Sequence, residues 1–121
     1  MNKLKIKRIY LPYDEEDGYR ILIDRLWPRG ISKTNAAIDE HCKNIAPSTE
    51  IRKTFGHKEE NYKAFAENYR NELANNNDAM PFVEHCRELL EDDNVTLLYG
   101  AKSETCNHAI ILRDWIMSKR K

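Results

Sequence analysis

Two short stretches that are apolar on both faces of an extended chain constrain the fold most. The segment RILIDRLW, residues 20–27, would place isoleucines on one face of a strand and leucines on the other. The segment VTLLYGA, residues 95–101, is likewise apolar on both faces. Strands of this kind are typical of the centre of a parallel sheet that is covered on both sides. Both segments are therefore predicted to be central strands of an α/β fold.

Helical patterns fill the span between these two strands. Ser32 can cap a first helix, and Ser48 can cap a short second helix that ends at Gly56. A third helix is interrupted by three consecutive asparagines, a fourth follows Asp78, and a last one begins near residues 105–107. The positions that define the five helices are Ala36, Ala37, Ile38 and Cys42; Ser48 and Gly56; Tyr62, Phe65, Ala66, Tyr69 and Leu73; Phe82, Val83, Cys86, Leu89 and Leu90; and Ile111, Leu112, Trp115 and Ile116.

A further strand is expected at about residues 3–10, where apolar residues alternate with lysines, before an acidic loop at 11–19. The long helical connection predicts that strands 20–27 and 95–101 are parallel. The first connection is too short for a helical crossover, so strand 3–10 is either antiparallel to 20–27 or not its neighbour. The sequence thus predicts one small three-layer α/β domain over residues 1–121. Its short, mostly parallel sheet of about three strands and about five helices would be flavodoxin-like or Rossmann-like.

Composition narrows the classes of partner. Among 121 residues, 20 basic side chains balance 20 acidic ones, which does not favour nucleic acid as a partner. No apolar run approaches the roughly 20 residues of a membrane span, and the N-terminus lacks the apolar core of a signal peptide. We therefore expect a cytoplasmic protein. Its three cysteines include no Cys-x-x-Cys, so they are expected to be reduced, and neither a metal nor a cofactor is expected.

The residues whose side chains could bind a ligand or take part in a reaction follow the two buried strands. In open α/β sheets, ligands bind beyond the carboxyl ends of the strands, and DRLWPRG and YGAKSETCNH leave the sheet there. Arginine can grip a carboxylate or phosphate with two hydrogen bonds, while tryptophan can stack on a flat ring. A competing interpretation makes Trp27 part of the core and pairs Asp24 with an arginine. The predicted ligand-binding residues are Arg25, Trp27, Arg29, Tyr99, Lys102 and Asn107.

Histidines are the candidates for proton transfer at this edge. His108 or His57 would carry the proton, with Asp24 orienting a histidine or an arginine. The loop before the last helix resembles an anion cradle, but Ser103, Thr105 or Asn107 could instead cap the helix. Cys106 is favoured as an inert thiol, although a thiol at a helix start tends toward a nucleophilic thiolate.

Two arginines elsewhere on the predicted helices are expected to form solvent-exposed ion pairs with acidic residues. Arg52 and Arg70 both have acidic neighbours on their own helices.

Several motifs together resemble the YeaO-like family, known as domain of unknown function 488. They are IKRIY, DGYRILIDRLWPRGISK, IAPSTEIRKTFGH, YRNEL and VTLLYGAKSETCNHAIIL, and they cover nearly the whole chain. The resemblance implies a small α/β domain without an agreed reaction. It also implies a shared site near Cys106-Asn107-His108, where longer relatives carry Cys-His-Arg. His41 and Tyr62 stand where family members often have tryptophan.

The leading functional hypothesis is a domain that binds a small anionic or nucleotide-like ligand at the carboxyl edge of its sheet. Hydrolysis or group transfer on that ligand is the natural chemistry if the domain is catalytic. The alternative is a non-catalytic interaction or regulatory module in which the arginines are structural. The ligand, the presence of catalysis and the oligomeric state are left open by the sequence.

Overall fold

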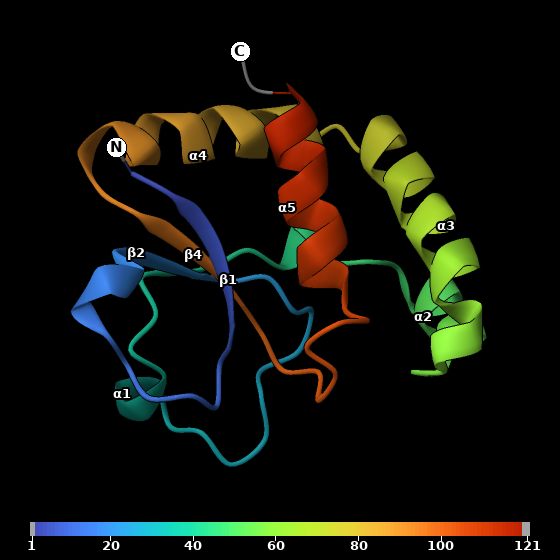
Figure 1. The fold of residues 1–121 in the computed structure, drawn as a ribbon, viewed down its shortest axis with the longest axis horizontal. Helices are drawn as coiled ribbons and strands as arrows, with labels where there is room; N and C mark the ends of the chain where they lie inside the picture. The colour runs from blue at the N-terminus through green and yellow to red at the C-terminus, as the bar shows by residue number, and fades with distance from the viewer. Residues whose placement is uncertain (1, 120–121) are drawn as a thin grey trace.

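The computed structural model describes residues 2–119 and contains a four-stranded parallel sheet with the strand order β1-β4-β2-β3 (Figure 1). The α/β class and the parallel sheet are as predicted. The first strand is not a neighbour of the second, because β4 inserts between them and pairs in parallel with both. The strands are β1 (Leu4–Arg8), β2 (Tyr19–Leu22), β3 (Glu40–His41) and β4 (Val95–Tyr99).

The helices agree with their predicted caps in the middle of the chain. The Ser48 side chain accepts a hydrogen bond from the Ile51 amide at the start of α2, and Gly56 ends α2 with a φ of 56°. The third helix ends at Asn75, within the asparagine run, and the fourth starts directly after Asp78. The helices are α1 (Lys33–Ala36), α2 (Thr49–Phe55), α3 (Tyr62–Asn75), α4 (Ala79–Asp92) and α5 (His108–Lys119).

The prediction for residues 33–42 was wrong beyond the first turn. Ser32 does cap α1, but the helix ends at Ala36 because Ala37 adopts the left-handed conformation with a φ of 49°. The chain then becomes strand β3, which pairs with β2. The second predicted strand is also shorter than residues 20–27, because its ladder ends at Leu22.

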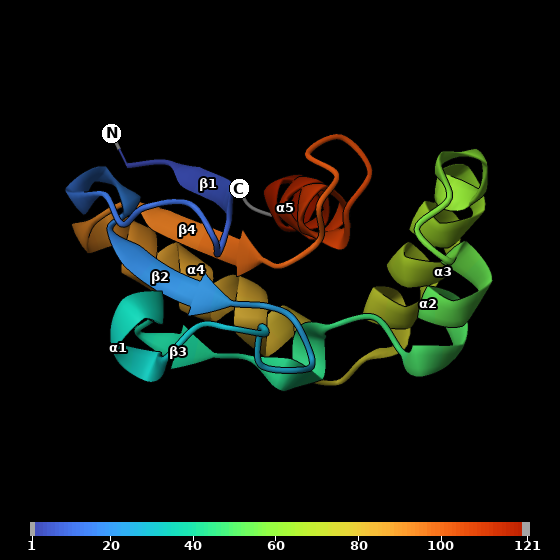
Figure 2. The same cartoon turned by 90° about the horizontal axis from the view of Figure 1, so that it is seen from below.

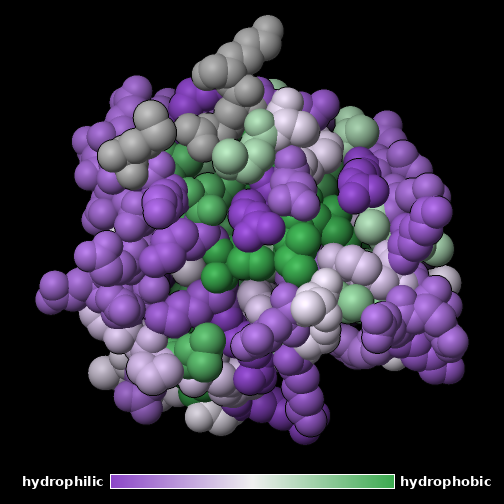
Figure 3. Space-filling view, viewed as in Figure 1, coloured by the Kyte–Doolittle hydropathy of each residue, from purple (hydrophilic) through white to green (hydrophobic). Residues whose placement is uncertain are grey.

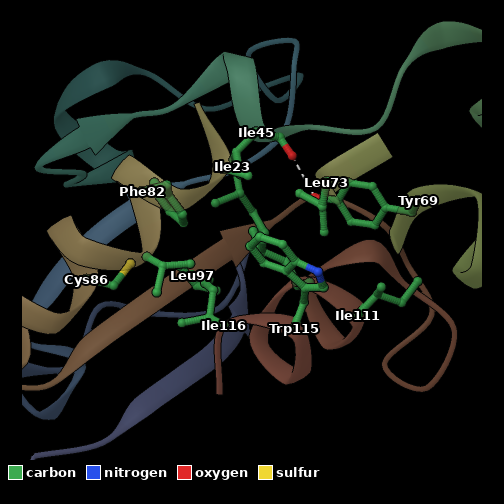
Figure 4. Close-up of a cluster of buried hydrophobic side chains, with 14 of the residues drawn as sticks. Ile23, Ile45, Tyr69, Leu73, Phe82, Cys86, Leu97, Ile111, Trp115 and Ile116 are labelled. Carbon is green, nitrogen blue, oxygen red and sulfur yellow. Dashed lines mark hydrogen bonds between the residues drawn. The ribbon is translucent and has the colours of Figure 1, made fainter. Parts of the chain in front are cut away.

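The two faces of the sheet are covered unequally. Helices α4 and α5 pack on the face that presents Ile21, Ile23 and Leu97. Figure 4 shows Ile23 and Leu97 among side chains of both helices. A second, smaller cluster around Leu22 and Leu98 is covered by α1 and the segment before it. In the view of Figure 3 the surface is largely hydrophilic around a hydrophobic strip over β1 and α5. The layer formed by α1 and the segment before it is thus much thinner than the layer formed by α4 and α5.

A buried ion pair lies on the thinly covered face. Arg20, only 1% exposed, binds the Asp17 carboxylate and donates to the carbonyls of Ala36 (2.9 Å) and Ala37 (3.0 Å). Lys7 Nζ lies 2.9 Å from the same carboxylate. Burial raises the pKa of Asp17, but hydrogen bonds from Lys7, the Asp14 backbone and Arg20 outweigh it and hold the pKa below its usual value. These contacts fix the loop before β2 and the end of α1 to the sheet.

Helices α2 and α3 are set apart from the sheet. Figure 2 shows them on the side toward which β2 and β4 run, beyond the carboxyl ends of these strands. The aromatic side chains of Phe55, Phe65 and Tyr69 join them to each other and to the main core. The Tyr69 hydroxyl donates to the Ile45 carbonyl at 2.6 Å, the dashed contact in Figure 4. This arrangement leaves space between α2 and the segments that leave the strands.

Candidate functional site

A cavity of about 490 Å³ occupies the space between α2 and the segments that follow β2 and β4. Its volume lies within the range of roughly 300–1,000 Å³ that is usual for small-molecule sites. Its charge is uneven, because one carboxylate lines it together with three permanent cations. The ionisable residues that line the cavity are Asp24, Arg25, Arg52, Lys53, His57 and His108, together with Tyr10.

Asp24 and His108 line the cavity side by side. His108 Nε2 lies 3.2 Å from the Ile23 carbonyl oxygen and 3.2 Å from Asp24 Oδ1. Because a carbonyl only accepts, Nε2 carries a proton. The other carboxylate oxygen, Oδ2, accepts the Gly100 amide at 2.9 Å. Two loops thus hold Asp24, which in turn faces the imidazole.

Arg25 points in a different direction from Asp24 and does not pair with it. Its Nη2 donates weakly to the carbonyls of Ala46 (3.4 Å) and Pro47 (3.3 Å). Its Nε is buried without a hydrogen-bond partner, and no carboxylate lies within 4 Å of it in the described part of the chain. The expected alternative, an Asp24–arginine salt bridge, is therefore absent from residues 2–119. Arg25 is a half-buried cation without an anion.

Trp27 contributes both to the core and to the cavity wall. Its indole N–H donates to the Ile31 carbonyl at 2.7 Å, and its ring meets His41 edge-on with centroids 5.9 Å apart. His41 Nε2 in turn lies 2.7 Å from the Asp24 carbonyl oxygen. Pro28 is buried and Gly30 has a φ of 76°, so the chain turns away sharply after Trp27. This turn fixes the indole beside the cavity.

The loop before α5 caps its own backbone. The Ser103 hydroxyl accepts the amides of Thr105 (3.3 Å) and Cys106 (2.9 Å), and Asn107 Oδ1 accepts the Ile110 amide at 3.0 Å. Asn107 is 1% exposed, and its Nδ2 donates to the Ser103 carbonyl. Of the two expectations for this loop, capping is the one observed. Asn107 still lines the cavity through its position under the loop.

Three predicted ligand-binding residues lie outside the cavity. Tyr99 is 3% exposed in the main core, where burial raises the pKa of its phenol. Its place follows from strand alternation, which puts it on the same face as Leu97. Arg29 and Lys102 are exposed and do not line the cavity. His57, by contrast, does line it, with its ring 5.6 Å from that of Phe55.

Sequence reasoning did not assign Tyr10, Arg52 and Lys53 to the site. Arg52 and Lys53 lie on α2, and Arg52 has no carboxylate within 4 Å among residues 2–119, contrary to the expected surface pairing. The Ser48 cap could have predicted Arg52 and Lys53. It sets where α2 begins, and the start of the helix determines which of its side chains face the ends of the strands. Tyr10 follows the edge strand, which gave no such signal.

The potential metal ligands and the three cysteines of the described chain form no metal-binding cluster. Within residues 2–119, no three side chains of His, Cys, Asp or Glu converge as metal ligands. Cys106 is half-buried and Cys86 is buried. Burial, followed by the charges of Glu40 and Asp78, raises the pKa of Cys42 to about 11. No helix within this part of the chain is long and apolar enough to cross a membrane.

Comparison with known proteins identifies the family. Residues 3–121 match a family model described as the inactive DUF488-N3 subclade. The chain belongs to this DUF488 family. A relative in the family, the uncharacterized protein YeaO of Escherichia coli (strain K12), is 46% identical over 115 residues, which cover 95% of this chain and 97% of YeaO. The predicted resemblance is thereby confirmed.

More distant relatives of this chain occur in mycobacteria. The uncharacterized proteins Rv3073c of Mycobacterium tuberculosis (strain ATCC 25618 / H37Rv) and Mb3100c of Mycobacterium bovis (strain ATCC BAA-935 / AF2122/97) are each 34% identical over 110 residues. These residues cover 91% of this chain and 90% of either relative. Comparison with solved structures found no match.

Proposed function

We propose that this DUF488 domain binds a small anionic molecule in the cavity at the carboxyl edge of β2 and β4, without changing it chemically. One observation carries the proposal: the half-buried guanidinium of Arg25 has no carboxylate partner among the described residues. A charge removed from water is costly unless it is paired, and two long contacts to carbonyls offset only part of that cost. A bound anion would supply the missing partner.

The surrounding charges support the same ligand class. Arg52 and Lys53 extend from α2 into the lining, which also includes His57. Asp24 is the single carboxylate among the described lining residues: its Oδ2 accepts the Gly100 amide, and its buried Oδ1 lies 3.2 Å from His108 Nε2 without a hydrogen-bond partner. We therefore assign Arg25, Arg52 and Lys53 to the anion.

Two observations favour binding over catalysis. The family model is described as an inactive subclade. In addition, His108 Nε2 donates to the Ile23 carbonyl, so this nitrogen is not available as a base. Hydrolysis or group transfer on the ligand, by His57 or His108 with Asp24, is the competing proposal. Incubation with the bound ligand would reveal it through the appearance of a product.

The two arginines of DRLWPRG allow a matched test. We expect Arg25→Met to weaken the binding of ribose 5-phosphate at least about tenfold, because hydrogen bonds to charged groups contribute roughly 1.5–3 kcal/mol. Arg29→Met, which changes an exposed arginine outside the cavity, should bind as the wild type does. Isothermal titration calorimetry measures both constants, and thermal melting checks that both variants fold. Equal effects of the two substitutions, or no binding of the phosphate to the wild type, would contradict the proposal.

A further inference from the structure

Tyr10 is an exposed aromatic residue at the mouth of the cavity. It follows β1 directly after Ile9, whose amide donates to the Tyr99 carbonyl at 2.8 Å. Its side chain is 43% exposed and lines the cavity. Exposed tyrosines are common on protein surfaces and usually keep their rotamer freedom. This ring does not, because neighbouring residues hold it at two points.

The first point is one face of the ring. The Arg8 guanidinium carbon lies 5.0 Å from the ring centroid, within the range of a cation–π contact. Arg8 is itself anchored, since its Nε donates to the Ala101 carbonyl at 2.8 Å and its Nη2 lies 3.5 Å from the Gly100 carbonyl. The loop after β4 therefore determines where the cation lies, and the cation determines the plane of the ring.

The second point is the phenol. The Tyr10 hydroxyl donates to the Arg29 carbonyl at 3.0 Å, which ties the ring to the turn that follows Trp27. Arg8 does not line the cavity, whereas Tyr10 does. Because Arg8 covers one face of the ring, the opposite face is the one left for a stacking partner. A rigid aromatic face of this kind loses little entropy when a second ring stacks on it.

A carboxylate lies near the edge of the same ring. A β-carbon at Gly100 would lie 2.9 Å from Asp24 Oδ2 and 3.9 Å from Tyr10 Cε2, so both groups lie against Gly100, where a side chain would crowd the carboxylate. Oδ2 accepts the Gly100 amide, whereas Oδ1 is buried without a hydrogen-bond partner, so the carboxylate can accept a further donor. A ring that stacks on Tyr10 would meet this acceptor if it carried an amino or ring N–H group.

We infer that the anion bound in the cavity is a nucleotide, whose base stacks on Tyr10 and whose phosphate pairs with Arg25. This inference rests on the proposed function, and it adds the class of ligand and a residue that determines specificity. The base supplies the flat face for Tyr10 and an N–H donor for Asp24, while the phosphate supplies the anion that Arg25 lacks. Sugar phosphates and inorganic phosphate supply the anion for Arg25 but no base for Tyr10 and Asp24.

Calorimetric titration with adenosine 5′-monophosphate and ribose 5-phosphate separates base recognition from phosphate recognition, because both probes carry the phosphate but ribose 5-phosphate has a hydroxyl in place of the base. We expect the wild type to bind the nucleotide about tenfold more tightly, in line with the usual contribution of base–aromatic stacking. Tyr10→Ala should remove this preference and leave the affinity for ribose 5-phosphate within about twofold. Tyr10→Phe, which keeps the ring, should retain most of the preference.

The possible failures are distinguishable. Equal affinity of the wild type for both probes would overturn the nucleotide inference and leave anion binding intact. Equal weakening of both probes by Tyr10→Ala would also overturn it, because the ring would then act through the shape of the cavity. Failure of both probes to bind the wild type would overturn the inference and the proposed function together. Thermal melting of each variant shows whether it is folded.

Discussion

Two arginines five positions apart, Arg20 in β2 and Arg25 just beyond its end, are held in different ways. Arg20 is almost fully buried, and a carboxylate, two carbonyls and the ring of Tyr13 surround its guanidinium. Arg25 is half-buried, has two long contacts to carbonyls and leaves Nε without an acceptor. The comparison teaches that burial alone does not reveal whether an arginine is structural. The presence of an anionic partner within the fold is the better guide.

Methionine substitutions at the two arginines should give the largest difference. Arg20→Met leaves Asp17 buried with Lys7 alone, and removing one partner of a buried ion pair costs roughly 3–5 kcal/mol in the free energy of unfolding. Arg25→Met strands no carboxylate, so we expect a change of about 1 kcal/mol or less. Urea denaturation of the two variants measures both effects. Similar losses at both positions would remove the distinction between a structural and a ligand-directed arginine.

Acid should weaken the Asp17–Arg20 cluster. Because the pKa of Asp17 is lower in the folded chain than its ordinary value of 3.8, the ionised carboxylate stabilises the fold above that value. This contribution is lost as the pH falls through the lower, folded-state pKa.

The Asp17→Asn variant isolates this effect from the other carboxylates. We expect the difference in unfolding free energy between wild type and Asp17→Asn to be largest near neutral pH and to shrink below about pH 4. Urea denaturation at a series of pH values measures it. A difference that stayed constant with pH would show that the charge of Asp17 does not stabilise the fold.

Much of the fold could be predicted because its signals are local. The apolar runs of β2 and β4, the Ser48 cap and the asparagines that end α3 each act over a few residues. Strand β3 gave no such signal, since only two residues pair and the pairing is completed by the amides of Asp39 and Cys42, which donate to β2 carbonyls. A left-handed alanine ends α1, where glycine or asparagine would be the usual marker.

The candidate site was predictable where it depends on the sheet edge. Asp24, Arg25, Trp27 and His108 come from segments that leave two parallel neighbouring strands, and they line one cavity. Residues whose direction depends on tertiary packing were not predictable. Arg29 points to solvent after the turn at Pro28, and Tyr10 approaches from a strand that pairs with β4 rather than with β2.

The central claim, that Arg25 is free for an anion while Arg20 is not, can be tested by NMR of the arginine Nε–Hε groups. Arg20 Nε already donates to the Ala37 carbonyl, whereas Arg25 Nε has no acceptor among residues 2–119. On titration with ribose 5-phosphate, we expect the Arg25 signal to shift and saturate while the Arg20 signal stays in place. An unmoved Arg25 signal, or equal shifts of both, would contradict the account.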